Sequence, residues 1–253
     1  SAFLLASREE ASTAIGMENE RIFAQLTAAG VVAVLVLDRE EDGPPVAEAL
    51  LAGGVTAMEL TLRTPAALGA LRAIRRQVPE MLAGIGTVIN TTQVAAVVEA
   101  GGAFGVSPGV NSRVIEAALS ARLPFAPGIC TPSDIEHALE YDLRLLKFFP
   151  AEACGGLKYL HNIAAPYAHL GLRYVPLGGV GLGNMGSYLA DAHVAAIGGS
   201  WLAARETIRD RRWSDITEAA RAAIAQRAPA STAAPLPCRK EPVRASMSRL
   251  PLW

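Results

Sequence analysis

The chain is poor in the features that define several classes of protein. Its three cysteines lie far apart and form no CxxC pair, which favours free thiols in a reducing compartment over disulfides or a zinc site. No apolar run approaches the roughly 18 residues that a membrane span requires. The net charge of -1 provides neither a basic face for nucleic acid nor a polybasic patch for a membrane surface. We therefore expect a cytoplasmic protein that binds a small molecule, without nucleic-acid or membrane partners.

Lysine is scarce as well. The chain contains only Lys147, Lys158 and Lys240. Lys158 falls in an expected helix beside Tyr159, and Lys240 falls in a polar tail, so both side chains should be solvated. If a lysine performs chemistry in this protein, it is Lys147.

A regular alternation of apolar, β-branched runs and segments with helical spacing fills most of the chain. Strands that alternate with helices predict a parallel sheet, and eight such units predict a closed (β/α)8 TIM barrel of α/β class. An open doubly wound sheet would favour a glycine-rich turn after the first strand, where this chain has Asp38 to Glu41. The expected strands are 31–37, 57–62, 82–86, 104–106, 125–127, 143–148, 173–175 and 195–197. The expected helices are 44–53, 65–77, 91–100, 112–121, 132–140, 156–163, 183–190, one that begins at 201, and 214–226.

The two ends of the chain differ from this pattern. Residues 1–17 have little periodicity and predict a loose leader, and residues 228–253 begin with a low-complexity stretch rich in Pro and Ala. Such a stretch buries too little surface to compensate for its ordering entropy. We therefore expect one domain, the barrel at 18–227, between a flexible leader and a flexible tail.

Lys147 stands within the apolar run 143–148. A buried, unpaired cation costs several kcal/mol or loses its proton, and an amine of lowered basicity is the form that attacks a carbonyl. The alternative is a strand-end lysine whose charge reaches water along its own methylenes. Glu59 stands in another apolar strand, either as a general acid/base or as the structural partner of an arginine.

Other candidates follow the expected strand ends, which carry the site in this fold. Arg63 is either a surface residue or a bidentate clamp for a carboxylate, and Thr87 either caps the next turn or binds the same carboxylate. Two glycine turns, Gly178-Gly179 and Gly199-Ser200, follow the last two strands. They are either tight turns of short loops or a phosphate site built from backbone N–H groups. Pro108 and Phe149 complete the rim.

Five segments together resemble the family of 2-keto-3-deoxy-6-phosphogluconate (KDPG) aldolases, which includes the 4-hydroxy-2-oxoglutarate (KHG) aldolases. They occur in the family's order and span about residues 20 to 205. The segments are ELTLRTP at 59–65, GIGTV at 84–88, VSPG at 106–109, KFFPAE at 147–152 and GGSW at 198–201.

The resemblance implies a class I aldolase that is a homotrimer of (β/α)8 barrels, without metal or cofactor. Lys147 would form a Schiff base with the pyruvate carbonyl, and Glu59 would shuttle protons. Arg63 and Thr87 would hold the pyruvate carboxylate, and Pro108 and Phe149 would line the pocket. The substrate phosphate would bind at a set of backbone and hydroxyl groups: Gly178, Gly179, Gly199 and Ser200. The products would be pyruvate and glyceraldehyde 3-phosphate.

One position departs from the family. Relatives commonly have Thr before the Gly-Gly pair, and this chain has Leu177, so one phosphate-directed hydroxyl is missing. Cleavage of KHG to pyruvate and glyoxylate is therefore an alternative within the class. A phosphosugar isomerase with Glu59 as base, or a non-catalytic phosphate-binding barrel, is the alternative outside it.

Overall fold

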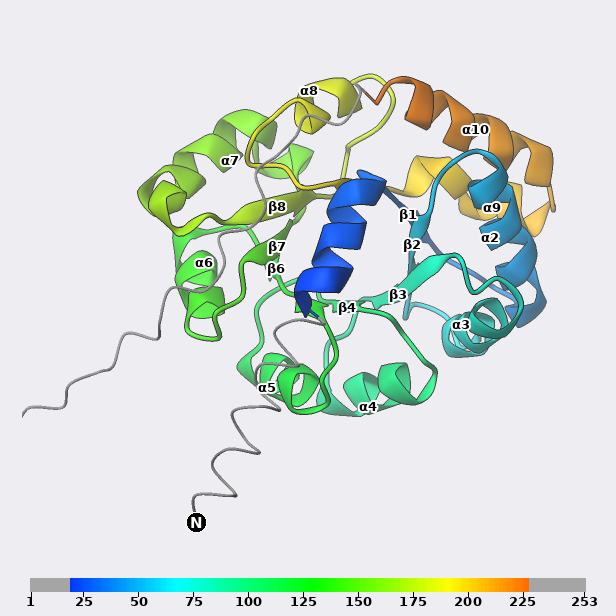
Figure 1. Cartoon of the computed structure of the whole chain (residues 1–253), viewed down its shortest axis with the longest axis horizontal. Coiled ribbons are helices and arrows are strands. Elements are labelled where there is room, and N and C mark those ends of the chain that lie inside the picture. Colours follow the sequence, from blue (N-terminus) through cyan, green and yellow to red (C-terminus); the bar gives the residue numbers. More distant parts are fainter. Residues whose placement is uncertain (1–18, 228–253) are drawn as a thin grey trace, which may run out of the picture.

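A computed structural model describes residues 19–227. The expected leader (1–17) and tail (228–253) lie outside these described residues. The described part is an α/β fold in which parallel strands are surrounded by helices (Figure 1). Within it, no helix is both long and apolar enough to cross a membrane.

The strands form two parallel sheets, one of six strands in the order β5-β4-β3-β2-β1-β9 and one of three in the order β6-β7-β8. Isolated parallel bridges, Tyr174 to Val194 and Leu177 to Gly198, join the β8 edge to the β9 segment. The strands are β1 (Val31–Leu35), β2 (Ala57–Thr61), β3 (Leu82–Gly86), β4 (Gly105–Val106), β5 (Phe125–Ala126), β6 (Gly128–Ile129), β7 (Leu145–Phe148), β8 (Arg173–Pro176) and β9 (Ile197–Gly199).

The expected fifth strand is thus divided into β5 and β6. Pro127 stands between them and has no N–H to donate to a ladder, although its carbonyl still accepts from the N–H of Lys147 at 2.9 Å. The prediction of parallel strands with helices around them is confirmed. The backbone ladder, however, runs in two sheets and not in one continuous closed sheet.

The helices follow the predicted sequence segments closely. Amphipathic spacing accounts for most of them: α3 buries Ala67, Ala70, Leu71 and Ile74 and leaves its arginines toward solvent. The α-helices are α2 (Gly43–Ala52), α3 (Ala66–Gln77), α4 (Thr91–Glu99), α5 (Ser112–Ser120), α6 (Pro132–Leu139), α7 (Gly156–Ala164), α8 (Met185–Leu189), α9 (Arg205–Arg209) and α10 (Trp213–Ala225). The 3-10 helices are η1 (Glu40–Asp42), η2 (Glu152–Cys154), η3 (Ala165–Leu170) and η4 (Ser200–Ala203).

The segment expected to be helical from Trp201 begins instead as η4, and α9 follows it. A further helix, at residues 19–29, was not predicted from the sequence. This blue helix crosses the middle of the view in Figure 1. Its Ile22, Phe23 and Leu26 pack in a small apolar cluster with the first residues of several strands, among them Ala57 of β2 and Leu145 of β7. The helix therefore covers the amino ends of the strands and leaves their carboxyl ends for a site.

Side chains on the other face of the strands join a second, larger cluster beneath the surrounding helices. In β7, Leu146 and Phe148 belong to this outer cluster, whereas Leu145 belongs to the small one. Because side chains alternate along a strand, Lys147 shares the inner face with Leu145. The same alternation in β2 places Glu59 on the inner face with Ala57, since Met58 and Leu60 belong to the outer cluster.

The contact between α2 and α10 offers a test of the packing. A Cβ added at Gly53 would lie 2.4 Å from the Cβ of Ala220 and 2.6 Å from the carbonyl oxygen of Thr217. Gly53→Ala should therefore lower the free energy of unfolding by about 1–3 kcal/mol, as overpacked cores do. Denaturant unfolding measures this change. Gly186→Ala is the control, because nothing lies within 4 Å of its added carbon; equal stabilities for the two variants would contradict the packing.

Candidate active site

A buried ion pair lies on the inner face of the strands. Lys147 Nζ is 3.1 Å from Glu59 Oε1, and the two residues are 7% and 3% exposed. They are 88 residues apart in the chain. Because Lys147 is buried, its charge does not reach water as that of a snorkelling side chain would. Glu59 pairs with this lysine and not with an arginine. Removing either partner of such a pair would leave an uncompensated buried charge.

Glycines make the space that the pair occupies. Glu59 pairs with Gly84 and Lys147 with Gly128 in the strand registers, so the inner face beside each carries no side chain. At Gly86, an added Cβ would lie 1.7 Å from Glu59 Oε1. The carboxylate thus lies directly over the Gly86 backbone.

This contact yields a prediction for catalysis. Gly86→Ala should displace the Glu59 carboxylate from Lys147 and lower kcat about a hundredfold, since a displacement of about 1 Å costs that much. Steady-state cleavage assays on folded protein measure the effect, with Gly186→Ala again as the control. A Gly86→Ala enzyme with unchanged kcat would show that the carboxylate position does not matter.

Arg63 and Thr87 follow β2 and β3, as predicted. Arg63 is exposed, and within residues 19–227 its guanidinium forms no hydrogen bond or ion pair. Thr87 has φ 62°, which is unusual for a β-branched residue and is a form of strain that clusters at ligand sites. Thr87 is not a helix cap, because the Asn90 side chain caps α4.

Phe149 and Pro108 lie near the pair. The Nζ of Lys147 is 5.4 Å from the centroid of the Phe149 ring, within the range of a cation–π contact. Pro108 is exposed in the loop after β4, and its carbonyl oxygen lies 2.2 Å from where a Cβ of Gly128 would stand. Gly128 pairs with Lys147, so the Phe149 ring lies next to the lysine and the Pro108 backbone lies beside the neighbouring strand.

Glycine is required for different reasons in the two turns. Gly178 and Gly179 have φ 93° and 82°, a region that favours glycine, and Gly178 lies against Pro150 and Phe149. Gly199 has φ -144°, which any residue adopts. It is small because the indole Nε1 of Trp201 lies 2.3 Å from where its Cβ would stand.

The bridge between Leu177 and Gly198 brings these two turns together. Ser200 is exposed at the start of η4. Leu177 is buried, and its Cγ lies 2.5 Å from where a Cβ of Gly198 would stand. The four phosphate-site candidates therefore lie on one edge, and the apolar Leu177 side chain lies against Gly198 there.

Glu152 and Tyr188 belong to the same rim and were not singled out from the sequence. The backbone N–H of Glu152 donates to the carbonyl of Gly178 at 3.0 Å, and its carboxylate accepts from the Tyr188 hydroxyl. Burial, with this hydrogen bond, raises the pKa of Tyr188. Glu152 thus holds the Gly178-Gly179 turn against the end of β7. The signal was present, because Glu152 ends the KFFPAE segment.

Cys130 and Cys154 are adjacent although they are distant in sequence. Their Sγ atoms lie 2.8 Å apart at the rim beyond β6 and β7, and both are free thiols. Burial and the neighbouring Cys154 raise the pKa of Cys130 to about 11, so it is protonated at neutral pH. Free thiols were expected; their proximity was not. Cys238 lies outside the described residues.

A cavity of about 470 Å³ lies elsewhere, beside helix 19–29. Its lining includes Arg21, Arg75, Arg122 and residues that precede strands, such as Met81 and Pro124. It therefore lies at the amino ends of the strands, opposite Lys147 and Glu59. The pair sits at a rim and not in this cavity.

Comparison with known proteins agrees with the geometry of the rim. The model of the family "KDPG and KHG aldolase" matches residues 22–219. The chain belongs to this aldolase family. All five segments quoted above, and every candidate site residue, lie within the matched range.

Individual KDPG and KHG aldolases are similar over nearly their whole length. The KHG/KDPG aldolase of Escherichia coli is 43% identical over 210 residues, which are 82% of this chain and 98% of that enzyme. The KDPG aldolase of Legionella pneumophila, solved with pyruvate captured as a covalent carbinolamine intermediate, is 38% identical with a TM-score of 0.75. That match covers 81% of this chain and 97% of the other.

A third relative is the KDPG aldolase of Zymomonas mobilis, solved with 3-phosphoglycerate. It is 35% identical with a TM-score of 0.72, over 81% of this chain and 94% of that one. These aldolases are lyases, and so is the family to which this chain belongs.

Proposed function

We propose that the protein is a class I aldolase that cleaves KDPG to pyruvate and glyceraldehyde 3-phosphate through a Schiff base on Lys147. The observation that carries the proposal is the buried Lys147–Glu59 pair at 3.1 Å. An amine nucleophile with an acid/base group in hydrogen-bond contact is the combination that imine chemistry requires. The covalent carbinolamine of the Legionella relative supports the same route.

The proposed reaction begins with proton transfer between the two partners. Glu59 accepts a proton from Lys147, and the neutral Nζ attacks the C2 carbonyl of the substrate to give a carbinolamine. Glu59 then returns a proton to the C2 hydroxyl, which leaves as water. The resulting iminium draws the electrons of the C3–C4 bond as a base removes the C4 hydroxyl proton. The aldehyde departs, the enamine is protonated at C3, and water releases pyruvate.

The remaining rim residues bind the two ends of the substrate in this proposal. Arg63, whose guanidinium is exposed at the end of β2, and Thr87 hold the carboxylate by charge-assisted hydrogen bonds. Phe149 and Pro108 line the pocket next to Lys147. The phosphate is bound by backbone N–H groups and one hydroxyl: Gly178, Gly179, Gly199 and Ser200. In this proposal, carboxylate binding, pocket lining and phosphate binding are all performed by protein groups without a metal ion.

KHG is the second candidate substrate because Leu177 presents no hydroxyl toward the phosphate-binding turns. The ratio of kcat/KM for KDPG to that for KHG decides between them. We expect the ratio to exceed one. A higher kcat/KM for KHG would assign the protein to KHG cleavage. A phosphosugar isomerase, or a non-catalytic phosphate-binding barrel, would give no pyruvate from either substrate.

The role of Leu177 can be tested directly. Leu177→Thr should lower KM for the phosphorylated substrate, because the hydroxyl adds a hydrogen bond to phosphate, and should leave glyoxylate condensation unchanged. Initial rates in both directions measure this effect. An equal change for both substrates would mean that the hydroxyl does not act on phosphate.

We also propose that the two sheets close into one (β/α)8 barrel, formed by residues 18–227 as a single domain. The bridges between the β8 edge and β9 support this closure, as does the single residue between β5 and β6. In the cell, we propose a cytoplasmic homotrimer in carbohydrate metabolism. Sedimentation equilibrium tests the assembly: a trimer has three times the chain mass of 26.5 kDa.

A further inference from the structure

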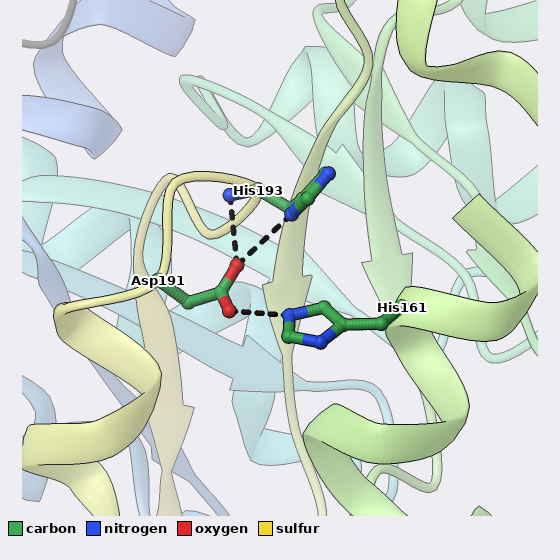
Figure 2. A group of neighbouring side chains, drawn as sticks. All are labelled: His161, Asp191 and His193. Carbon is green, nitrogen blue, oxygen red and sulfur yellow. Dashed lines mark hydrogen bonds and ion pairs between the residues drawn. The ribbon is translucent and has the colours of Figure 1, made fainter. Parts of the chain in front are cut away.

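Three potential metal ligands meet on the outer surface, away from the Lys147–Glu59 pair. His161 comes from α7, and Asp191 and His193 come from the connection between α8 and β9. Figure 2 shows Asp191 between the two imidazole rings. Its Oδ2 lies 2.5 Å from His161 Nε2, and its Oδ1 lies 3.1 Å from His193 Nδ1.

The cluster is separate from the proposed reaction. The carbonyl of His193 accepts the N–H of Tyr174, the second residue of β8, so the cluster lies where β8 and β9 begin. The Tyr174 side chain belongs to the outer cluster beneath the helices, whereas Lys147 and Glu59 lie on the inner face. None of the three residues has a role in the proposed aldol cleavage.

The distances suit a small divalent cation. All three donor atoms lie within 4.8 Å of one another. Zinc binds imidazole nitrogen and carboxylate oxygen at about 2.0–2.2 Å, which places ligand atoms of a tetrahedral site about 3.3 Å apart. Small side-chain rotations reach this spacing, because the His161 and His193 side chains are 49% and 38% exposed. The same exposure leaves room for water at the remaining position.

The carboxylate is held in place between the two rings. The backbone N–H of His193 donates to Oδ1 at 2.9 Å and fixes the carboxylate between the rings. A carboxylate flanked by two imidazoles is a donor set typical of zinc and related metals.

Few of the chain's potential metal ligands come together as these three do. The chain has four histidines, and two of them meet here. Within residues 19–227, this is the one group of three or more His, Cys, Asp or Glu residues whose ligand atoms converge so closely. The two rings, with centroids 5.4 Å apart, face the same carboxylate.

We propose that His161, Asp191 and His193 form a peripheral site for a divalent transition-metal ion of the zinc type. On binding, the nitrogen of each imidazole that faces Asp191 releases the proton it shares with the carboxylate to solvent and binds the ion, a proton remains on the other ring nitrogen, and water completes the coordination. The bound ion links α7 to the connection between α8 and β9, which are otherwise joined here by the hydrogen bond between His161 and Asp191. The site stabilises the fold and takes no part in the Schiff-base chemistry.

The test uses the full, untagged chain, because a histidine tag would bind zinc itself. Competition with a chromophoric chelator should give one Zn²⁺ bound per chain. His161→Ala and His193→Ala should each weaken binding at least about tenfold, since each removes one of three protein ligands. His169→Ala, at an exposed histidine in η3, is the matched control and should bind as the wild type does. Full-strength binding by both His161→Ala and His193→Ala would overturn the proposal.

The thiol pair requires its own control, because Cys130 and Cys154 can also bind zinc. The double variant Cys130→Ser/Cys154→Ser should keep its Zn²⁺ affinity; loss of binding in it would assign the ion to the thiols and overturn the proposal. Protection from chemical modification tests the site on the wild-type chain, without any substitution. Saturating Zn²⁺ should protect His161 and His193, but not His169, from diethyl pyrocarbonate. Modification of all three at equal rates would also overturn the site, with no bearing on the proposed aldolase.

Discussion

Lys147→Arg should fold normally and lose at least about a thousandfold in kcat, because a permanently charged guanidinium forms no imine. The arginine retains a positive charge near Glu59, so the buried carboxylate keeps a partner. Steady-state cleavage of KDPG, with far-UV circular dichroism to verify folding, measures the effect. Lys147→Ala is a weaker test, because it leaves Glu59 buried and unpaired, which costs about 3–5 kcal/mol of stability.

The matched control for this variant is Lys158→Arg. Lys158 lies on the exposed side of α7, and its replacement should leave kcat and KM unchanged. Retained cleavage by Lys147→Arg would show that the reaction needs only a cation at this position. The phosphosugar isomerase reading, with Glu59 as base and no imine, would then gain support.

Glu59→Gln should lower kcat by about 10²- to 10⁴-fold, the range that a general acid/base residue contributes. The amide has nearly the volume of the carboxylate and still accepts a hydrogen bond from Lys147 through its oxygen. It neither takes the proton from Nζ nor delivers one to the leaving hydroxyl. Pyruvate should therefore still bind, and the loss should appear in kcat more than in KM.

Glu99→Gln, at a carboxylate exposed at the end of α4, controls for a general effect of removing one charge. Rapid mixing with pyruvate gives a second measurement. The Glu59→Gln enzyme should form its Schiff base more slowly than the wild type does. Equal rates of Schiff-base formation and equal kcat would remove Glu59 from the proton transfers.

Local pattern predicted the parts of the fold that depend on alternation and amphipathic spacing. Lys147 and Glu59 are 88 residues apart, but both interrupt apolar strands. Both were expected at strand ends on one rim, but their direct contact was not predicted, because β2 and β7 belong to different sheets. Helix α3 was likewise visible in the spacing of its buried alanines and leucine.

Features set by tertiary contacts were not predictable in this way. Helix 19–29 is short and its helical state depends on packing Ile22, Phe23 and Leu26 over the strand starts. The fifth strand is divided because Pro127 has no N–H to donate to a neighbouring strand, and which strand lies beside it is set by the tertiary fold. The positive φ of Thr87 carries no mark in the sequence, because threonine rarely adopts it.

Pairs and clusters formed across loops were also beyond the sequence. Cys130 and Cys154 are 24 residues apart, and the absence of a CxxC pair led to the expectation of separate thiols. His161 and Asp191 are 30 residues apart. They lie in a helix and a connecting loop, and their separation does not match the short ligand spacing of known metal-binding motifs. Such contacts depend on how two loops or helices meet, which local pattern does not encode.

Trapping the covalent intermediate is the most direct test of the proposed mechanism. The protein is incubated with pyruvate and reduced with borohydride, and its peptides are analysed by mass spectrometry. We predict one reduced pyruvate adduct per chain, located on Lys147, and no adduct in Lys147→Arg. An unmodified Lys147 in an enzyme that still cleaves KDPG, or an adduct on Lys158 instead, would contradict the Schiff-base mechanism.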